Sequence, residues 1–120
     1  MSRVLVSLTV LLAALAVAAA APAAPTKTTV LRLTAQGTAL KFDKKTLRAR
    51  AGKVSLVFTN RAPMSHNVAI KGKGVRKLGK VVGRGGVSKV TVTLKKGKYR
   101  YFCSVPGHEA AGMWGTLTVR

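Results

Sequence analysis

The sequence predicts an all-β domain, a sandwich or small barrel of about eight short strands, preceded by an export leader. Three observations predict this class. β-Branched residues recur in short alternating segments, Gly, Asn, Asp and Pro separate these segments, and helical periodicity is absent beyond the leader. The expected strands are residues 28–34, 39–42, 46–50, 53–60, 66–70, 87–94, 98–103 and 114–119.

Alternation assigns a core face to the longer strands. In residues 53–60, Val54, Leu56 and Phe58 are expected to point inward, whereas Ser55 between them faces water. Successive side chains of a strand lie on opposite faces, so the same pattern selects one face in the other strands. The further inward positions are His66, Val68, Ile70, Val90, Val92, Leu94, Tyr99, Tyr101, Cys103, Leu117 and Val119.

A basic, glycine-rich stretch, residues 71–86, separates two of these strands. It is either a docking surface or a solvated connection, because runs of charge are common in both. Val75, Leu78, Val81 and Val82 are expected to pin part of it to the core.

The first residues are typical of an export signal. Arg3 precedes an apolar stretch from Val4 to Ala21, and small-residue motifs ending at Ala20 or Ala23 offer cleavage sites. We therefore assign residues 1–24 to a signal peptide and short linker, and residues 25–120 to the folded domain. An uncleaved leader of this length would instead anchor the protein in a membrane. The expected location is the periplasm, the cell exterior or the outer face of the cytoplasmic membrane.

The charge balance is strongly basic. Lys and Arg number 22 against two acids, so the formal net charge is +20, and loss of Arg3 with the leader leaves +19. Such a field favours an acidic redox protein, an anionic membrane or an acidic wall polymer as partner. Nucleic acid is not expected, since the chain is exported and carries no recognised nucleic-acid motif. We expect a monomer.

One loop concentrates metal-binding chemistry. It carries Cys103, which is the only cysteine, together with His108 and Met113. A thiolate, an imidazole and a thioether form a soft donor set that suits copper best. His66, the only other histidine, lies in a distant strand and can complete the set only if the fold brings it there. Two imidazoles, a thiolate and a long axial thioether would make the trigonal site of blue copper proteins.

Other readings of the same residues explain less. Zinc could occupy the site, but the thioether adds nothing for it. A nucleophilic Cys–His pair would need an open cleft and would leave Met113 without a role. Multicopper and dinuclear copper centres need more histidines or a second cysteine.

Three segments carry a resemblance to a known family. YFCSVPGHEAAGMWGTLTV, FTNRAPMSHNVAI and FDKKTLRARAGKVSLVF closely resemble the cupredoxins of the plastocyanin and azurin type, over essentially the whole mature chain. The resemblance implies a Greek-key β-sandwich and one Cu(I)/Cu(II) ion per chain, held by His66, Cys103, His108 and Met113. It also implies that Asn67 and Ser104 tie the two ligand loops together. The C-x4-H-x4-M spacing leaves the subfamily open.

The resemblance further implies how electrons leave the site. The edge of His108 would reach the surface within an apolar patch of neighbouring side chains, and Glu109 beside it would orient a basic partner or lessen local repulsion. The implied patch consists of Pro63, Met64, Pro106, Gly107, Ala110 and Ala111.

Three functions remain open at this point. The first is a one-electron carrier between redox partners, which is not an enzyme. The second is copper storage or delivery with the same ligands. The third is a basic surface-binding domain whose copper is incidental.

Overall fold

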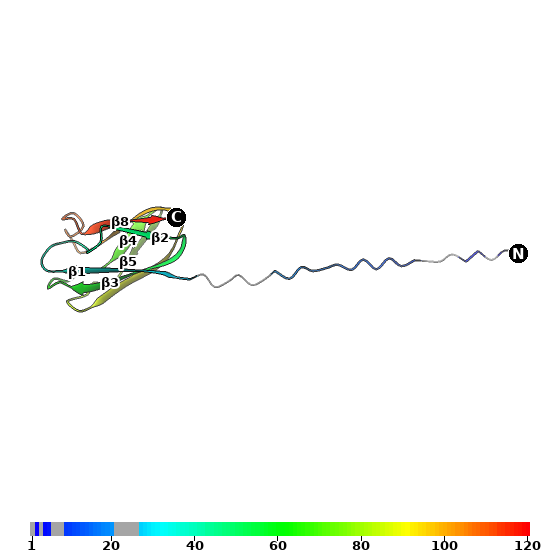
Figure 1. The fold of residues 1–120 in the computed structure, drawn as a ribbon, viewed down its shortest axis with the longest axis horizontal. Coiled ribbons are helices and arrows are strands. Elements are labelled where there is room, and N and C mark those ends of the chain that lie inside the picture. The colour runs from blue at the N-terminus through cyan, green and yellow to red at the C-terminus, as the bar shows by residue number, and fades with distance from the viewer. Residues whose placement is uncertain (1, 3, 6–8, 21–26) are drawn as a thin grey trace.

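Eight strands form the domain in the computed structural model, which describes residues 2, 4–5, 9–20 and 27–120 (Figure 1). No helix occurs among these residues, and none of them builds a helix suited to crossing a membrane. The strands are β1 (Thr29–Gln36), β2 (Thr46–Ala49), β3 (Gly52–Arg61), β4 (Ala69–Gly72), β5 (Val75–Leu78), β6 (Val87–Leu94), β7 (Gly97–Phe102) and β8 (Trp114–Val119).

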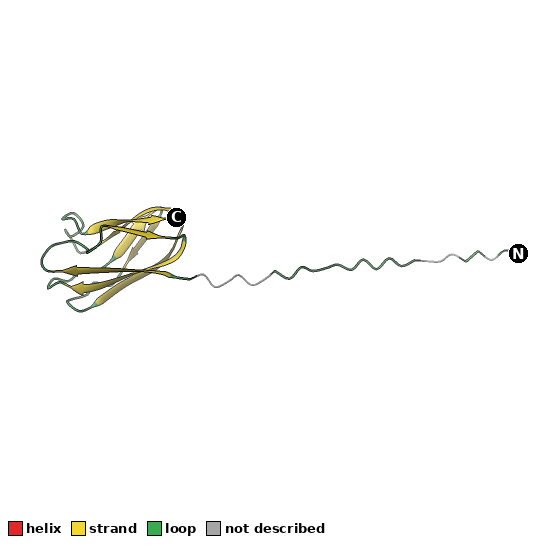
Figure 2. Ribbon diagram, viewed as in Figure 1, coloured by secondary structure: helices red, strands yellow, loops and turns green. Residues whose placement is uncertain are grey.

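The strands pair into two sheets that pack face to face (Figure 2). The first sheet has the order β1-β3-β6 and the second the order β2-β8-β7-β4-β5. β1 runs parallel to β3 and β2 parallel to β8, while every other pair is antiparallel. Strands that are neighbours in a sheet are therefore often distant in sequence. This confirms the predicted all-β sandwich.

The core lies between the sheets and follows the predicted alternation. Val54, Leu56 and Phe58 are fully buried on β3, and their counterparts on β7 and β8 face them. Phe42 meets the Phe58 ring edge to face, with ring centroids 5.5 Å apart. Such edge-to-face pairs add stabilisation beyond the area they bury. All of these core residues lie within residues 29–120, and the described residues 2, 4–5 and 9–20 are exposed and contribute nothing to this core.

Three details of the sequence prediction are wrong. Residues 39–42 form no strand, although Phe42 is buried there. The stretch 71–86 contains a strand, β5, which pairs with β4 at the sheet edge, where Leu78 and Val81 remain about half exposed. Ser55 is buried, because its hydroxyl pairs with that of Thr91 on β6, at 2.6 Å. Local alternation does not report such pairings.

The strand ends define two poles of the sandwich. β7 ends and β8 begins at one pole, where the connecting loop lies, shown in orange to red in Figure 1. β1 begins at the other pole, beside the C-terminus. The assignment of residues 1–24 to a leader falls partly on residues 1, 3, 6–8 and 21–24, which lie outside the described residues. It stays a prediction.

Candidate metal centre

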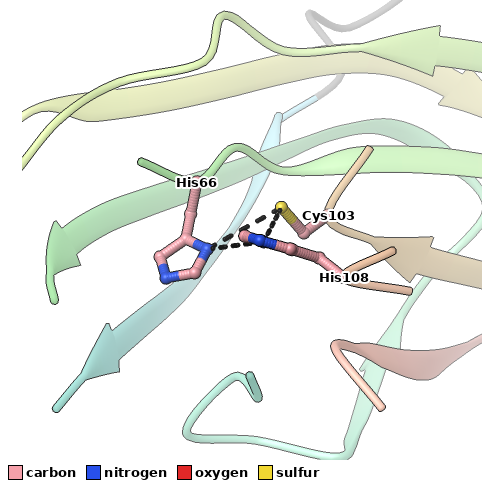
Figure 3. A group of neighbouring side chains, drawn as sticks. All are labelled: His66, Cys103 and His108. Atoms are coloured by element: carbon pink, nitrogen blue, oxygen red, sulfur yellow. Dashed lines mark hydrogen bonds between the residues drawn. The ribbon is translucent and has the colours of Figure 1, made fainter. Parts of the chain in front are cut away.

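Three side chains converge at the pole where β7 ends (Figure 3). The Nδ1 atoms of His66 and His108 lie 3.1 Å apart. The Cys103 sulfur lies 3.9 Å from the His66 nitrogen and 3.6 Å from the His108 nitrogen. One nitrogen of each imidazole and one sulfur thus face a common point, as three ligands of one ion would.

Backbone pairing holds each of these residues in place. His66 exchanges two backbone hydrogen bonds with Val82, at 3.1 and 2.9 Å. Cys103 immediately follows β7, and its N–H donates to the Met113 carbonyl at 3.0 Å. The Met113 N–H in turn donates to the His108 carbonyl at 3.0 Å. The loop is therefore closed on itself, with both of its ends anchored in the second sheet.

Met113 belongs to this pole as well. Its side chain is fully buried in the core cluster that also contains Cys103, and it directly precedes β8. His108 is only half-buried, so its ring lies between the interior and the surface. The four residues expected to act together thus share one end of the sandwich.

Burial shifts the pKa values of two of these groups in directions that bear on metal binding. It lowers the pKa of His66, and the nearby His108 adds to this effect, so the imidazole is neutral and can act as a ligand. Burial raises the pKa of the Cys103 thiol, and the N–H groups of Asn67 and Val105 act in the opposite direction. A metal that binds this sulfur must therefore displace a proton.

A family model decides the identity of the fold. The model of copper-binding proteins of the plastocyanin/azurin family matches residues 29–120. The chain belongs to this family. Its members are cupredoxins, and the recognition made from the three sequence segments is thereby confirmed.

Solved structures agree with this assignment. An auracyanin from the photosynthetic bacterium Roseiflexus castenholzii is 26% identical, covers 80% of this chain and 99% of its own, and has a TM-score of 0.67. Auracyanin B is 25% identical, with coverages of 82% and 93% and a TM-score of 0.69. Auracyanin A, a blue copper protein of Chloroflexus aurantiacus, is 24% identical, with coverages of 78% and 100% and a TM-score of 0.68, and shows the fold alone. No curated protein sequence matches the chain.

Both the family and the set of donor atoms indicate that copper is the cofactor. Two imidazole nitrogens and a thiolate sulfur converge, and a thioether lies in the same buried cluster. Soft sulfur ligands select copper over harder ions, and the mixed set suits both of its oxidation states. The residues present therefore fit one copper ion.

A hydrogen-bonded bridge joins the two ligand loops of this cupredoxin. The side chain of Asn67 donates to the Ser104 hydroxyl at 2.7 Å and to the Gly79 carbonyl at 2.9 Å. The Ser104 N–H donates back to the side-chain oxygen of Asn67, Oδ1, at 2.7 Å. Asn67 follows His66 and Ser104 follows Cys103, so the bridge fixes the distance between two of the converging residues.

Glu109 plays a role that the sequence did not suggest. Its carboxylate forms ion pairs with Lys71 on β4 at 2.8 Å and with Arg100 on β7 at 3.0 Å. The pKa of Glu109 is lowered, because these two cations outweigh the effect of its partial burial. The carboxylate thus ties the loop to the second sheet instead of facing outward toward a partner. Only the pairing of distant strands could have revealed this.

The residues of the implied apolar patch are all exposed. Met64 is 37% exposed, and the other residues of the implied patch, Pro63, Pro106, Gly107, Ala110 and Ala111, are exposed too. Trp114 borders this pole, and its ring lies between the ammonium of Lys45 at 3.6 Å and the guanidinium of Arg100 at 3.8 Å. These cation–π contacts hold the first residue of β8 in place.

Proposed function

We propose that this cupredoxin is an exported one-electron carrier that binds copper through His66, Cys103, His108 and Met113. The convergence of two imidazole nitrogens and one sulfur within 4.8 Å of one another carries the proposal. Copper at this place would supply one-electron chemistry between Cu(II) and Cu(I).

The protein's contribution is a frame that is already assembled. The hydrogen bonds of His66 with Val82 and of Cys103 with Met113 belong to the sheets and their connections. A frame of this kind keeps the ligand positions similar in both oxidation states, so that little rearrangement accompanies electron transfer. Asn67 and Ser104 add rigidity between the loops and, by holding groups near the thiolate, tune the reduction potential.

Electrons are proposed to enter and leave through the half-buried ring of His108. The small, exposed residues around it let a redox partner approach closely, and no substrate is transformed. The net charge of +20 favours partners with acidic docking faces. With such a partner, the association rate should fall steeply as salt is added.

The decisive experiment uses residues 27–120 loaded with Cu(II). Intense blue colour, fast electron exchange and retention of the metal against a chelator are expected. Ready transfer of copper to the chelator, with slow electron exchange, would instead support storage or delivery. Absence of colour and redox activity would contradict the proposal and leave a surface-binding domain.

Single substitutions test the ligand set. Cys103→Ser is expected to abolish the colour, since no thiolate remains, and Met113→Leu to change the spectrum and the potential. Met64→Leu is the matched control, because this methionine is exposed and lies outside the core cluster. A normal blue spectrum in Cys103→Ser would overturn the assignment.

Export is tested on the full chain. Expressed with its leader, the protein should leave the cytoplasm as a chain beginning at Ala21 or Ala24. An intact mass that still includes Met1, in the membrane fraction, would show an anchor instead. Retention in the cytoplasm would contradict export.

A further inference from the structure

The acidic side chains of the chain lie in the half of the domain that carries the copper site. Asp43 lines a surface hollow together with Ala111, Gly112 and Trp114, which border Met113. Glu109 lies within the ligand loop itself. The chain contains no other acidic residue. The opposite half therefore carries only cationic side chains among its charged residues.

These cations gather around the pole farthest from the copper site. The turn between β2 and β3, the turn between β6 and β7, and the residue after β8 meet there, as the pairing of Gly52 with Leu94 and of Gly97 with Val119 shows. The Lys73 ammonium reaches across to the Lys96 carbonyl at 3.0 Å. We call the following exposed residues the basic pole: Arg48, Arg50, Lys53, Lys73, Lys95, Lys96 and Arg120.

The basic pole contains a broad surface hollow lined by arginines. Its volume is about 810 Å³, and it is lined by Arg48, Arg50 and Arg120 together with Thr29, Ala49 and Ala51. None of these arginines forms an ion pair with an acidic side chain of the described residues. Guanidinium groups bind phosphate through paired, charge-assisted hydrogen bonds. The hollow thus offers unpaired donors to an anionic headgroup.

We propose that the basic pole binds the surface of an anionic phospholipid bilayer, with the copper site facing away from it. Charge complementarity supports this occupant, because lysine and arginine near such a surface each add to the attraction. Where the leader is retained as an anchor, the course of the chain supports it as well. β1 begins at this pole, and only residues 22–28 separate it from the apolar leader, a reach of at most about 25 Å.

This orientation agrees with a carrier that exchanges electrons with other proteins. β8 runs from Trp114, next to Met113, to Val119 at the basic pole, so the two poles are separated by about 20 Å of strand. A Debye length at physiological salt is about 8 Å, so charges near the copper site contribute little to lipid binding in this pose. The inference does not rest on the copper chemistry, because the copper-free domain carries the same basic pole.

The test measures binding of copper-free residues 27–120 to vesicles by co-sedimentation. The vesicles are phosphatidylcholine alone, or phosphatidylcholine with about 30% phosphatidylglycerol, in about 0.1 M salt. Binding to the anionic vesicles alone is expected. Replacing Arg50, Lys95, Lys96 and Arg120 together by Gln should weaken this binding at least about tenfold.

A matched variant separates position from net charge. Replacing Lys41, Arg61, Lys80 and Arg84 by Gln removes the same number of lysines and arginines from exposed sites in the copper half. This variant should lose no more than about threefold in affinity. Equal losses in the two variants, or unchanged binding in the first, would overturn the assignment. Cooperative urea unfolding of each copper-free variant checks that it is folded.

Two further readouts address the orientation and the class of partner. Trp114, the only tryptophan, lies at the copper pole and should keep its fluorescence when the vesicles carry brominated acyl chains. Quenching would refute the proposed orientation. Binding to soluble polyglutamate without binding to anionic vesicles would overturn the lipid proposal in favour of an acidic polymer.

Discussion

Asn67→Ala tests whether the bridge between the ligand loops stabilises the fold before any metal is bound. Asn67 is fully buried, and its side chain makes three hydrogen bonds, two with Ser104 and one with Gly79. The substitution removes all three and leaves the Ser104 N–H and the Gly79 carbonyl without these partners. The two loops would then be joined only through the sheets.

The expected cost follows from these contacts. A typical intramolecular hydrogen bond contributes about 1 kcal/mol net, so losing three destabilises the domain by about 3 kcal/mol. For a domain of this size, 1 kcal/mol corresponds to a shift in Tm of roughly 5 °C, so Asn67→Ala should lower the Tm by roughly 15 °C. Ser104→Ala removes only the bond to the hydroxyl and keeps the backbone N–H. Its expected cost is about 1 kcal/mol.

Urea and thermal unfolding of the copper-free domain measure both variants against the unaltered domain. Copper must be absent, because a ligand that binds only the folded state would add its own stabilisation. If Asn67→Ala cost no more than Ser104→Ala, the bridge would not be the structural tie described above. In the copper-loaded protein, a shifted potential in Asn67→Ala would show that the bridge also tunes the site.

Two further predictions concern residues that are not expected to bind the metal. Partial burial alone would raise the pKa of Asp43, but the hydrogen bond from the Thr34 N–H and a neighbouring lysine lower it below its ordinary 3.8. This carboxylate therefore stabilises the fold above pH 3.8, and the stabilisation is lost as the pH falls through the lowered pKa. In Asp43→Asn, the free energy of unfolding in urea should therefore fall less steeply as the solution is made acidic. An unchanged acid dependence would contradict this. In Gly115→Ala the new methyl group would collide with the Tyr101 ring across the β7–β8 pair, and urea unfolding should show a loss of about 3 kcal/mol in stability. Gly83→Ala is the control, because its methyl group would face open space and should cost less than about 0.5 kcal/mol. Equal costs for the two glycine variants would refute the collision.

Local patterns were sufficient for most of the strands but not for the sheet edge. Val54, Leu56 and Phe58 are buried as predicted, because alternation reports a half-buried strand directly. β5 escaped prediction because an edge strand buries little, and its Leu78 stays exposed. Residues 39–42 show the converse, since Phe42 is buried without belonging to a strand.

The composition and order of residues determined the chemistry on offer. A single cysteine is followed in one loop by a histidine and a methionine, and one more histidine lies upstream. This set of donors favours copper over other metals, because the preference of sulfur and nitrogen atoms for a metal depends on the atoms themselves. The excess of basic residues and the apolar stretch near the N-terminus are likewise visible without a fold.

Only the tertiary structure decided where that chemistry acts. The approach of His66 to Cys103 requires β4 and β7 to pair, and the two ion pairs of Glu109 require Lys71 and Arg100 to lie side by side. The basic pole requires two turns and the end of β8 to meet. These contacts join residues far apart in the chain. Their geometry depends on strand register, which no local run of residues specifies alone.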